Sequence, residues 1–258
     1  MRKGRSCAYR CLREVFPTRV RDVRYVPWRL VYALRRFRGS LAADEFIRRT
    51  LRDVPVFLSR GEYLGACVRE AGNGLRLEFG VFGGESVNLV ADVVRDLPDS
   101  QVFGFDSFEG LPEDWYRGLE KGWFRLDRLP AVRPNVTLVK GLFQDTLEGF
   151  LRTHPGRVGF LHVDSDLYSS AKFVLETLWA HDRIRPGTII AFDEYTDYPN
   201  WEVDGEFKAF HEWIGEHAVD FEYFAYLAAS GSVSVKIISI SPERAPIPAP
   251  TPPTAAHR

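Results

Sequence analysis

The sequence predicts an α/β domain with a doubly wound, mostly parallel sheet of seven strands that ends in an antiparallel hairpin. Short apolar runs alternate with amphipathic stretches along the chain, which is the pattern of a parallel sheet covered by helices on both faces. At 258 residues, of which 45% are hydrophobic, the chain is long enough for one sizeable α/β domain. Two full domains would be crowded.

The elements are expected in a regular order. Two helix-like segments, separated near Pro55, are expected between Ala43 and Ala71. The next five strands are expected near residues 75–79, 101–105, 136–139, 158–163 and 187–192. Helical stretches separate these strands, so the strands should run parallel to one another.

The last two apolar runs differ from the earlier ones. Residues 221–230 and 233–240 are separated only by Gly231 and Ser232. That spacing leaves no room for a crossover helix, so the two strands should pair antiparallel. A parallel sheet that ends in such a hairpin is typical of Rossmann-like class I methyltransferases and unusual for nicotinamide-binding Rossmann domains.

Charge is distributed unevenly along the chain. Residues 1–60 carry sixteen lysines and arginines against five acidic residues, although the formal net charge of the whole chain is only -1. We therefore predict a basic helical N-terminal extension over residues 1–60, a main domain over residues 61–241 and a disordered proline-rich tail over residues 242–258. The charges of the extension are expected to be solvated, with contact to an anionic membrane or a role as a targeting peptide as the alternatives.

Composition disfavours several classes of location and partner. The three cysteines are too few and too unevenly placed for a disulfide framework, which favours a reducing cytoplasm. No apolar run approaches the roughly 18 to 20 residues needed to span a bilayer. The net charge gives no indication of nucleic-acid binding. We expect a small-molecule partner, and a homo-oligomer stays open.

A glycine-rich turn, residues 80–84, follows the first strand of the expected parallel series. Glu78 lies at the end of that strand, and Ser86 lies near the start of the next helix. Gly80 and Gly84 let the chain adopt positive φ and let a ligand lie against bare backbone, while the helix N-terminus supplies unpaired N–H donors. An adenosyl ligand with a carboxylate fits such a turn. The spacing is not G-x-G-x-x-G, which disfavours a nicotinamide cofactor.

Polar and apolar side chains follow the next two strands. Asp106 ends the second strand, where doubly wound folds place an acid that accepts hydrogen bonds from ribose hydroxyls, and Ser107 follows it. After the third strand, Leu142 and Phe143 are expected to flank an adenine ring, and Asp145 to accept from its exocyclic amine. The alternatives are a turn or cap role for Asp106 and core packing for Phe143. Ligands bind beyond the carboxyl ends of strands in open sheets, so the order of these groups predicts a cofactor site.

Four acidic residues follow the fourth and fifth strands of the parallel series: Asp164, Asp166, Asp193 and Glu194. Adjacent strand ends would bring these carboxylates together, and close carboxylates repel unless they are neutralised, so a hard cation such as Mg²⁺ is expected. The structural alternative is that the acids cap helices and pair with arginines. Asp164 is the candidate base for deprotonating a metal-bound hydroxyl, whereas the rival His162 lies within an apolar run and fits a core or supporting histidine better.

In these motifs the sequence resembles a known family, the macrocin O-methyltransferases, which modify sugars on macrolide antibiotics, together with the related novobiocin sugar methyltransferase. The resemblance covers about residues 60–240 and rests on five motifs in order: EFGVFGGES, VFGFDSFEGLPEDW, VKGLFQDTL, HVDSDLYSS and FDEYTDYPNW. It implies a class I fold, S-adenosylmethionine as donor and dependence on Mg²⁺. It also implies that Asp164 is both metal ligand and base, and that Asp193 and Glu194 are metal ligands. The characterised sugar enzymes have Asp-Asp where this chain has Asp-Glu.

The sequence therefore predicts an S-adenosylmethionine-dependent O-methyltransferase of natural-product biosynthesis. Its acceptor would be a hydroxyl of a sugar or other secondary metabolite, with assistance from Mg²⁺. Two alternatives remain: a metal-dependent glycosyltransferase that uses Asp164 and Asp166 as an Asp-x-Asp motif, and a catalytically inactive cofactor-binding module. Tyr195, Tyr198 and Trp201 follow the second acidic pair and are expected either to wall an acceptor sugar or to pack the loop.

Overall fold

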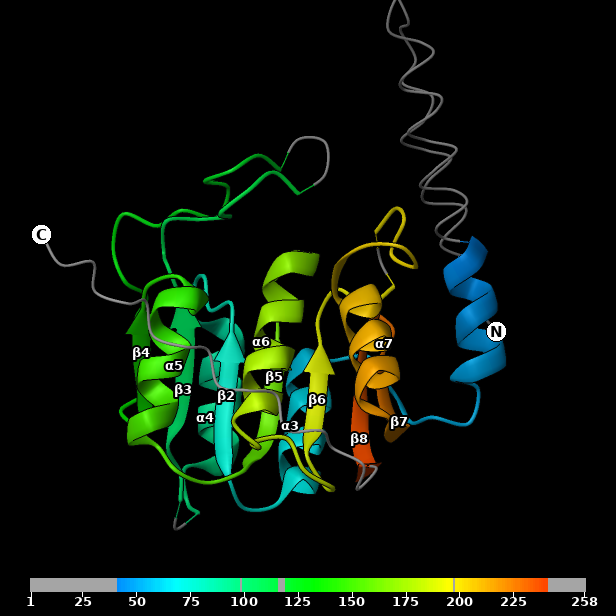
Figure 1. Cartoon of the computed structure of the whole chain (residues 1–258), viewed down its shortest axis with the longest axis horizontal. Coiled ribbons are helices and arrows are strands. Elements are labelled where there is room, and N and C mark those ends of the chain that lie inside the picture. The colour runs from blue at the N-terminus through cyan, green and yellow to red at the C-terminus, as the bar shows by residue number, and fades with distance from the viewer. Residues whose placement is uncertain (1–40, 98, 116–118, 197, 241–258) are drawn as a thin grey trace, which may run out of the picture.

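The computed structural model describes residues 41–97, 99–115, 119–196 and 198–240, and within them the strands form one sheet between two layers of helices (Figure 1). The strands are β1 (Val56–Phe57), β2 (Leu75–Phe79), β3 (Val102–Asp106), β4 (Val136–Lys140), β5 (Val158–Val163), β6 (Ile189–Phe192), β7 (Val219–Leu227) and β8 (Ser232–Ile240). The helices are α3 (Arg60–Ala71), α4 (Glu85–Val94), α5 (Phe143–Thr153), α6 (Tyr168–Ala180) and α7 (Gly205–His217), and residues 41–50 are also helical.

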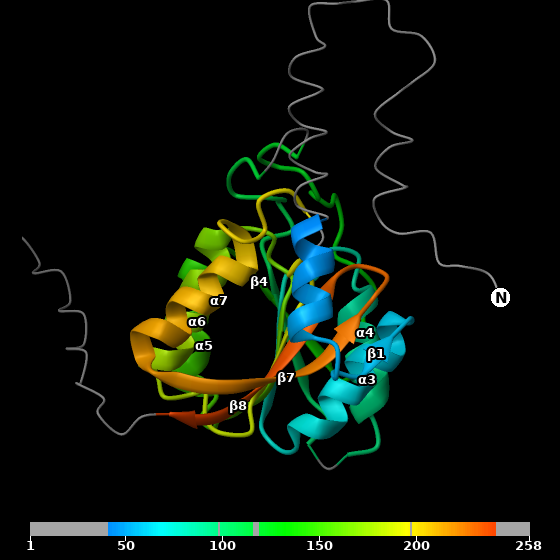
Figure 2. The same cartoon turned by 90° about the vertical axis from the view of Figure 1, so that its right-hand side faces the viewer.

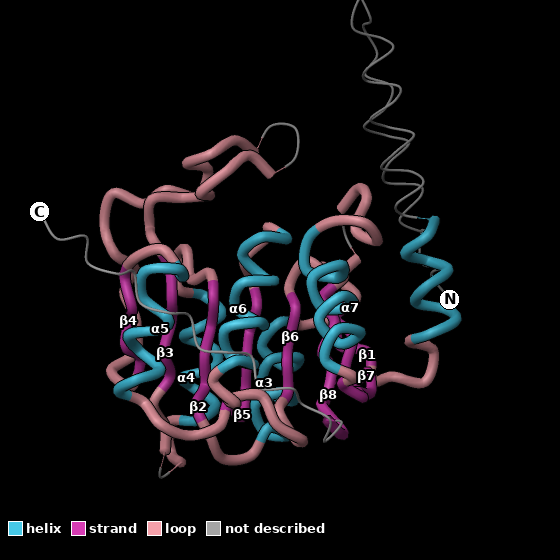
Figure 3. The backbone as a smooth tube through the Cα atoms, viewed as in Figure 1, coloured by secondary structure: helices cyan, strands magenta, loops and turns pink. Residues whose placement is uncertain are grey.

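The sheet confirms the predicted fold class and corrects the strand number. Its eight described strands lie in the order β1-β7-β8-β6-β5-β2-β3-β4 (Figure 3). The neighbours from β6 to β4 in that order are parallel, and the β7–β8 pair is antiparallel with Leu227 opposite Ser232, as the short connection requires. The prediction of seven strands was wrong because β1 has only two residues, too few to show an alternating pattern. Val56 of β1 pairs with Tyr226 at the outer edge of β7.

Helices cover the two faces of the sheet separately. Figure 2 shows α3 and α4 on one face and α5, α6 and α7 on the other. The spacing of apolar residues explains this placement for α4, in which Val87, Val90, Ala91 and Val94 recur on one side of the helix and are buried. The two faces carry separate apolar cores.

The segment before α3 packs against the apolar core on the face of the sheet that α5, α6 and α7 cover. Phe46, in the helical residues 41–50, lies 5.3 Å from Trp201 and 5.8 Å from Phe207 between ring centroids. Leu51 is buried. The predicted extension contributes these contacts through its last residues, whereas its residues 1–40 and the predicted tail, 242–258, lie outside the described residues. The domain boundaries stay predictions, and none of the described helices is long and apolar enough to cross a membrane.

Candidate functional site

A cavity of about 270 Å³ lies at the carboxyl edge of the sheet. It is bordered by the loops that follow β2, β3, β4, β5 and β6, and by the start of α3. This is where open α/β sheets bind ligands. Its lining includes several of the predicted site residues, namely Gly80, Asp106, Ser107, Leu142, Phe143, Asp164, Asp193 and Glu194. Glu78, Gly84, Ser86 and Asp145 are not part of the lining.

The glycine turn passes directly over the backbone of the loop after β5. Gly80 has φ of 94°, and a Cβ added to it would lie 1.7 Å from the carbonyl oxygen of Asp164. No other residue fits there without moving backbone. Gly84 has φ of 82° and caps the N-terminus of α4 without a side-chain hydrogen bond. The turn therefore joins the predicted donor site to the predicted acidic site through contact between main chains.

Asp106 holds the glycine turn in place. Its Oδ2 accepts hydrogen bonds from the backbone N–H groups of Val81 and Phe82, both at 2.8 Å, and its Oδ1 accepts from the N–H of Phe108 at 2.7 Å. A carboxylate offers about four acceptor positions, so one remains on Oδ1 for a ribose hydroxyl. The turn role and the ribose-binding role that the sequence left open are compatible with each other.

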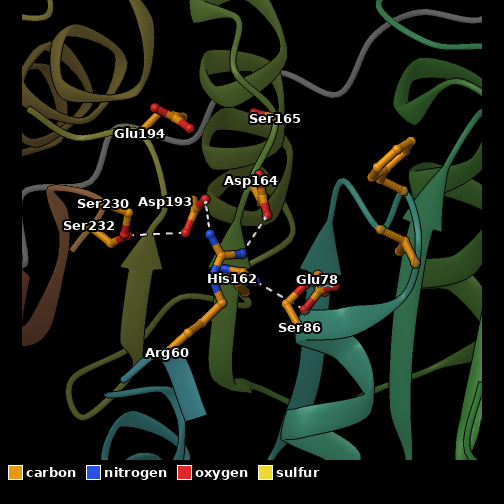
Figure 4. A network of polar contacts seen from close by, with 12 residues as sticks. Arg60, Glu78, Ser86, His162, Asp164, Ser165, Asp193, Glu194, Ser230 and Ser232 are labelled. Atoms are coloured by element: carbon orange, nitrogen blue, oxygen red, sulfur yellow. Dashed lines mark hydrogen bonds and ion pairs between the residues drawn. The ribbon is translucent and has the colours of Figure 1, made fainter. Parts of the chain in front are cut away.

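Glu78 and Ser86 form a buried network beneath the turn (Figure 4). The hydroxyl of Ser86 donates to Glu78 Oε1 at 2.9 Å, and Nδ1 of His162 lies 3.0 Å from Glu78 Oε2. All three residues are buried. His162 thus supports the site through its contact with Glu78. Glu78 and Ser86 link the end of β2 and the start of α4 on either side of the turn, and His162 connects them to β5.

The loop after β4 supplies the apolar side of the cavity. Leu142 and Phe143 line it at the start of α5, and Phe143 packs edge-on against Phe79 with ring centroids 5.1 Å apart. Asp145 lies in the first turn of α5, where its backbone N–H donates to the carbonyl oxygen of Leu142 at 3.0 Å. Phe143 thus packs against Phe79 and also borders the cavity, so the structure shows its core packing, and its contact with a ligand stays a prediction.

The acidic residues meet an arginine at the ends of β5 and β6. Nη2 of Arg60 donates to Asp193 Oδ2 at 2.7 Å, and its Nη1 lies 3.7 Å from Asp164 Oδ2. Ser232 donates to the other oxygen of Asp193 at 3.1 Å. Figure 4 shows the guanidinium between the two aspartates, with the side chain of Glu194 pointing away from it. The pairing with arginine that the sequence left open is thus present.

The acidic cluster carries more negative charge than Arg60 balances. Burial raises the pKa of Asp164 well above its ordinary value, and the carboxylates of Asp193, Asp166 and Glu206 raise it further. Burial, together with Asp193 and Asp106, raises the pKa of Asp166 to about 7. Uncompensated carboxylates of this kind favour the binding of a cation.

Glu206, at the start of α7, holds the two acidic loops together. Its Oε1 accepts the N–H of Ser165 at 3.0 Å, and its Oε2 accepts the N–H of Glu194 at 3.1 Å. The side chain is fully buried. Burial raises the pKa of Glu206, and the hydrogen bond from Ser165 opposes that shift. Because the two loops follow different strands, this one carboxylate sets the spacing between Asp164 and Asp193.

The donor set is suited to a hard divalent cation. Among the described residues, one group near the cavity, formed by His162, Asp164 and Asp193, has ligand atoms within 4.8 Å of one another, and Glu194 is outside that group. Ser165 borders the cavity, and its buried hydroxyl has no hydrogen-bond partner among the described residues. Carboxylate oxygens and an unsatisfied hydroxyl fit Mg²⁺ or its bound water. Arg60 already contacts both carboxylates.

The aromatic residues after β6 pack into the protein interior and do not line the cavity. Tyr195, Tyr198 and Trp201 are at most 5% exposed, and none of them lines the cavity. Tyr198 donates to the carbonyl oxygen of Asp204 at 2.7 Å. Aromatic rings do line the cavity elsewhere: Phe82 and Phe124 meet there with centroids 5.4 Å apart and are 48% and 37% exposed.

Sequence reasoning missed Arg60, Glu206 and the Phe82–Phe124 pair as site residues. Arg60 stands among many arginines in the basic N-terminal region, so no local pattern distinguishes it. Glu206 follows Asp204 and Gly205, which is the pattern of a helix start. An acid in the first turn of a helix is already explained by the helix dipole, so the sequence gives no reason to assign it to the site. These contacts arise only when segments far apart in the sequence meet.

Comparison with known proteins agrees with this arrangement. Residues 77–195 match the family described as Methyltransferase domain. This segment is similar to methyltransferases. It contains the glycine turn, Asp106 and both acidic loops, and it spans somewhat less than half of the chain. No curated protein matches the sequence.

Two solved methyltransferase structures share the fold. The O-methyltransferase NovP is 22% identical, with a TM-score of 0.54 over 70% of this chain and 80% of NovP. CalS11, a calicheamicin methyltransferase, is 20% identical, with a TM-score of 0.51 over 89% of this chain and 90% of CalS11. The Rossmann-like methyltransferase fold that the terminal hairpin predicted is thus confirmed. The match of residues 77–195 to a methyltransferase domain favours the methyltransferase prediction over the glycosyltransferase alternative.

Proposed function

We propose that the protein is an S-adenosylmethionine-dependent O-methyltransferase that acts on a hydroxyl of a sugar or other secondary metabolite. The observation that carries this proposal is the cavity itself, because the glycine turn, Asp106 and the Leu142–Phe143 pair share it with Asp164 and Asp193. A donor-binding surface and a set of groups able to take up a proton therefore border one space. The methyltransferase domain match over residues 77–195 supports the same activity.

Different residues are proposed to bind different parts of S-adenosylmethionine. Gly80 exposes bare backbone to the methionine end of the ligand, and the remaining acceptor position of Asp106 is available to a ribose hydroxyl. Ser107 lies beside Asp106 and lines the same cavity. Leu142 and Phe143 offer an apolar surface to the adenine ring, whereas Asp145, which is exposed and outside the lining, would have to turn toward the cavity to reach its exocyclic amine. Glu78, Gly84 and Ser86 act from outside the cavity by holding the turn and the start of α4.

Asp164 is the proposed catalytic base. S-adenosylmethionine, when bound, supplies an electrophilic methyl group, and Mg²⁺, when bound, supplies charge that makes the acceptor hydroxyl more acidic. Asp164 would take up the proton that the acceptor hydroxyl loses on transfer, and S-adenosylhomocysteine would leave as the other product. Burial and the neighbouring carboxylates raise the pKa of Asp164, so a cation bound beside it would favour the ionised form that accepts a proton.

The residues proposed to hold Mg²⁺ are Asp164, Asp193 and Glu194. Asp164 and Asp193 face each other across Arg60, whereas Glu194 would have to turn toward them from its present position. Asp193 is the better fixed of the two aspartates, because Ser232 and Arg60 each hold one of its oxygens. Asp164, whose side chain is 25% exposed, is the more accessible to an acceptor.

Calorimetry and methyl transfer test the proposal in two steps. The full chain should bind S-adenosylhomocysteine and show no affinity for a nucleotide sugar; the opposite pattern would replace this proposal with the glycosyltransferase alternative. Methyl transfer from radiolabelled donor to a panel of glycosides should then be lost in Asp164→Asn while S-adenosylhomocysteine binding is kept. Asp96→Asn, an 89% exposed aspartate just after α4, is the matched control. Unchanged transfer in Asp164→Asn would remove Asp164 as the base.

A further inference from the structure

Arg60 contributes to the site although it precedes, in the chain, all the strands whose ends carry the predicted site residues. It is the first residue of α3, directly after the N-cap Ser59. Its guanidinium contacts Asp193 at 2.7 Å and lies 3.7 Å from Asp164, and it lines the proposed catalytic cavity. Figure 4 shows it reaching up from α3 to the point where β5 and β6 end.

Arg60 is the only lysine or arginine among the described residues that line the cavity, whereas five acidic residues do so. The Arg60 guanidinium is positive, because arginine is not deprotonated in proteins, and it lies against the carboxylates of Asp193 and Asp164. It therefore provides the resident positive charge between Asp164 and Asp193, at the position where the ligand atoms of those residues come within 4.8 Å of each other.

A guanidinium and a divalent cation cannot share these two carboxylates without strong repulsion, because both are positive and would lie within a few ångströms of each other. One oxygen of Asp193 is already taken by Ser232 and the other by Arg60. Each oxygen keeps a further acceptor position, so charge repulsion from the guanidinium, and not occupancy, makes a cation at Asp193 compete with Arg60. The negative charge of Glu85, in the first turn of α4, also acts on Arg60.

We propose that Arg60 is a positioning residue that competes with a divalent cation for the carboxylates of Asp164 and Asp193. Without the cation, Arg60 keeps the two aspartates together and partly neutralised. With the cation, Arg60 leaves and α3 changes its contacts with the site. The inference rests on the proposed function for its role in methyl transfer, but its test measures metal binding alone, so the two can fail separately.

The test compares Mn²⁺ binding to the full chain by electron paramagnetic resonance in variants at position 60. Arg60→Gln removes the competing charge and should bind Mn²⁺ more tightly than the natural chain by roughly tenfold or more. Arg60→Lys keeps the charge but loses the forked geometry and should fall between them. Arg133→Gln, at an exposed arginine that pairs with Asp92, is the control and should leave Mn²⁺ affinity unchanged.

Several outcomes would overturn the competition. They are equal or weaker Mn²⁺ binding in Arg60→Gln, absence of Mn²⁺ binding in every variant, and a gain in Arg60→Gln that persists when Asp193 is also changed to Asn. A residue that only supported the fold would weaken metal binding when it is lost, so the direction of the change separates the two roles. If Arg60→Gln does not fold, the Arg60→Lys comparison carries the test. S-adenosylhomocysteine binding, measured in parallel, reports on the proposed function by itself.

Discussion

The glycine turn and the acidic edge lie next to each other, yet they are held by different kinds of contact. The turn, residues 80–84, is set by backbone: Gly80 passes over the carbonyl of Asp164, and Asp106 from the adjacent strand accepts two of its N–H groups. The acidic edge, formed by Asp164 and Asp193 with their neighbours, is set by charged side chains that come from α3 and α7.

The difference shows how one site combines a rigid half with an adjustable half. Steric contact between main chains leaves the turn one conformation, because packed atoms cannot yield gradually. Ion pairs at the acidic edge can exchange partners, since a second cation can compete with Arg60 for the same carboxylates. The donor side is therefore expected to tolerate substitution least, and the acidic side to respond to ions.

The largest effect is expected from Gly80→Ala. The added Cβ would lie 1.7 Å from the Asp164 carbonyl oxygen at φ of 94°, so either the turn or the loop after β5 must move. The free energy of unfolding should fall by about 3 kcal/mol or more, with loss of S-adenosylhomocysteine binding. Urea unfolding and calorimetry measure the two quantities.

Gly83→Ala is the matched control for that change. A Cβ at Gly83 meets nothing within 4 Å, and this residue does not require a left-handed backbone. Its free energy of unfolding should stay within about 0.5 kcal/mol of the natural value. Equal losses in the two variants would show that general loss of glycine flexibility, and not contact with Asp164, controls the turn.

An intermediate effect is expected from Glu206→Gln at the acidic edge. The substitution leaves one acceptor oxygen for two buried N–H groups, those of Ser165 and Glu194, and points an amide donor at one of them. The free energy of unfolding should fall by about 2 kcal/mol in urea titrations, and methyl transfer should fall more than S-adenosylhomocysteine affinity. Glu202→Gln, at an exposed neighbour, should change neither. A larger loss of cofactor affinity than of transfer would mean that Glu206 serves the donor side.

Asp106→Asn should have a smaller effect on stability and the opposite division between binding and transfer. Asn can still accept from Val81 and Phe82 through its oxygen, but its amide faces the N–H of Phe108. We expect a loss of about 1 kcal/mol in the free energy of unfolding and weaker S-adenosylhomocysteine binding by calorimetry. Asp127→Asn, an exposed position, is the control. Unaltered cofactor binding would limit Asp106 to a structural role.

The smallest effect is expected for alkylation of Cys67, which lies two turns after Arg60 on α3. The rate of alkylation reports how tightly α3 packs against the sheet. Burial raises the pKa of the Cys67 thiol to about 12, against a partial lowering by Ser234, so the thiol stays protonated near neutral pH. In a chain with Cys7 and Cys11 replaced by serine, alkylation at pH 8 should be slow until urea unfolds the protein. Faster alkylation on addition of Mn²⁺ would indicate that release of Arg60 loosens α3 as a whole.

The positions of the residues proposed to bind the donor could be predicted because their contacts are local or lie between neighbouring strands. The glycines from 80 to 84, Asp106 and the Leu142–Phe143 pair each follow a strand that the apolar pattern identifies. Their convergence then follows from parallel order alone. The two-residue strand β1 was missed because its pairing with β7 joins residues about 170 positions apart, and two residues carry no period.

At the acidic edge, too, one part of the arrangement could be predicted from the sequence and another part could not. The sequence by itself determined that Asp164, Asp166, Asp193 and Glu194 lie at adjacent strand ends, because strand period and order are properties of the local pattern. Only the tertiary structure decided which cation faces them, which buried carboxylate spaces them, and that Tyr195, Tyr198 and Trp201 are packed away from the cavity. The physical reason is that pairing between distant side chains depends on how α3 and α7 pack against the sheet, and packing is a property of the whole chain.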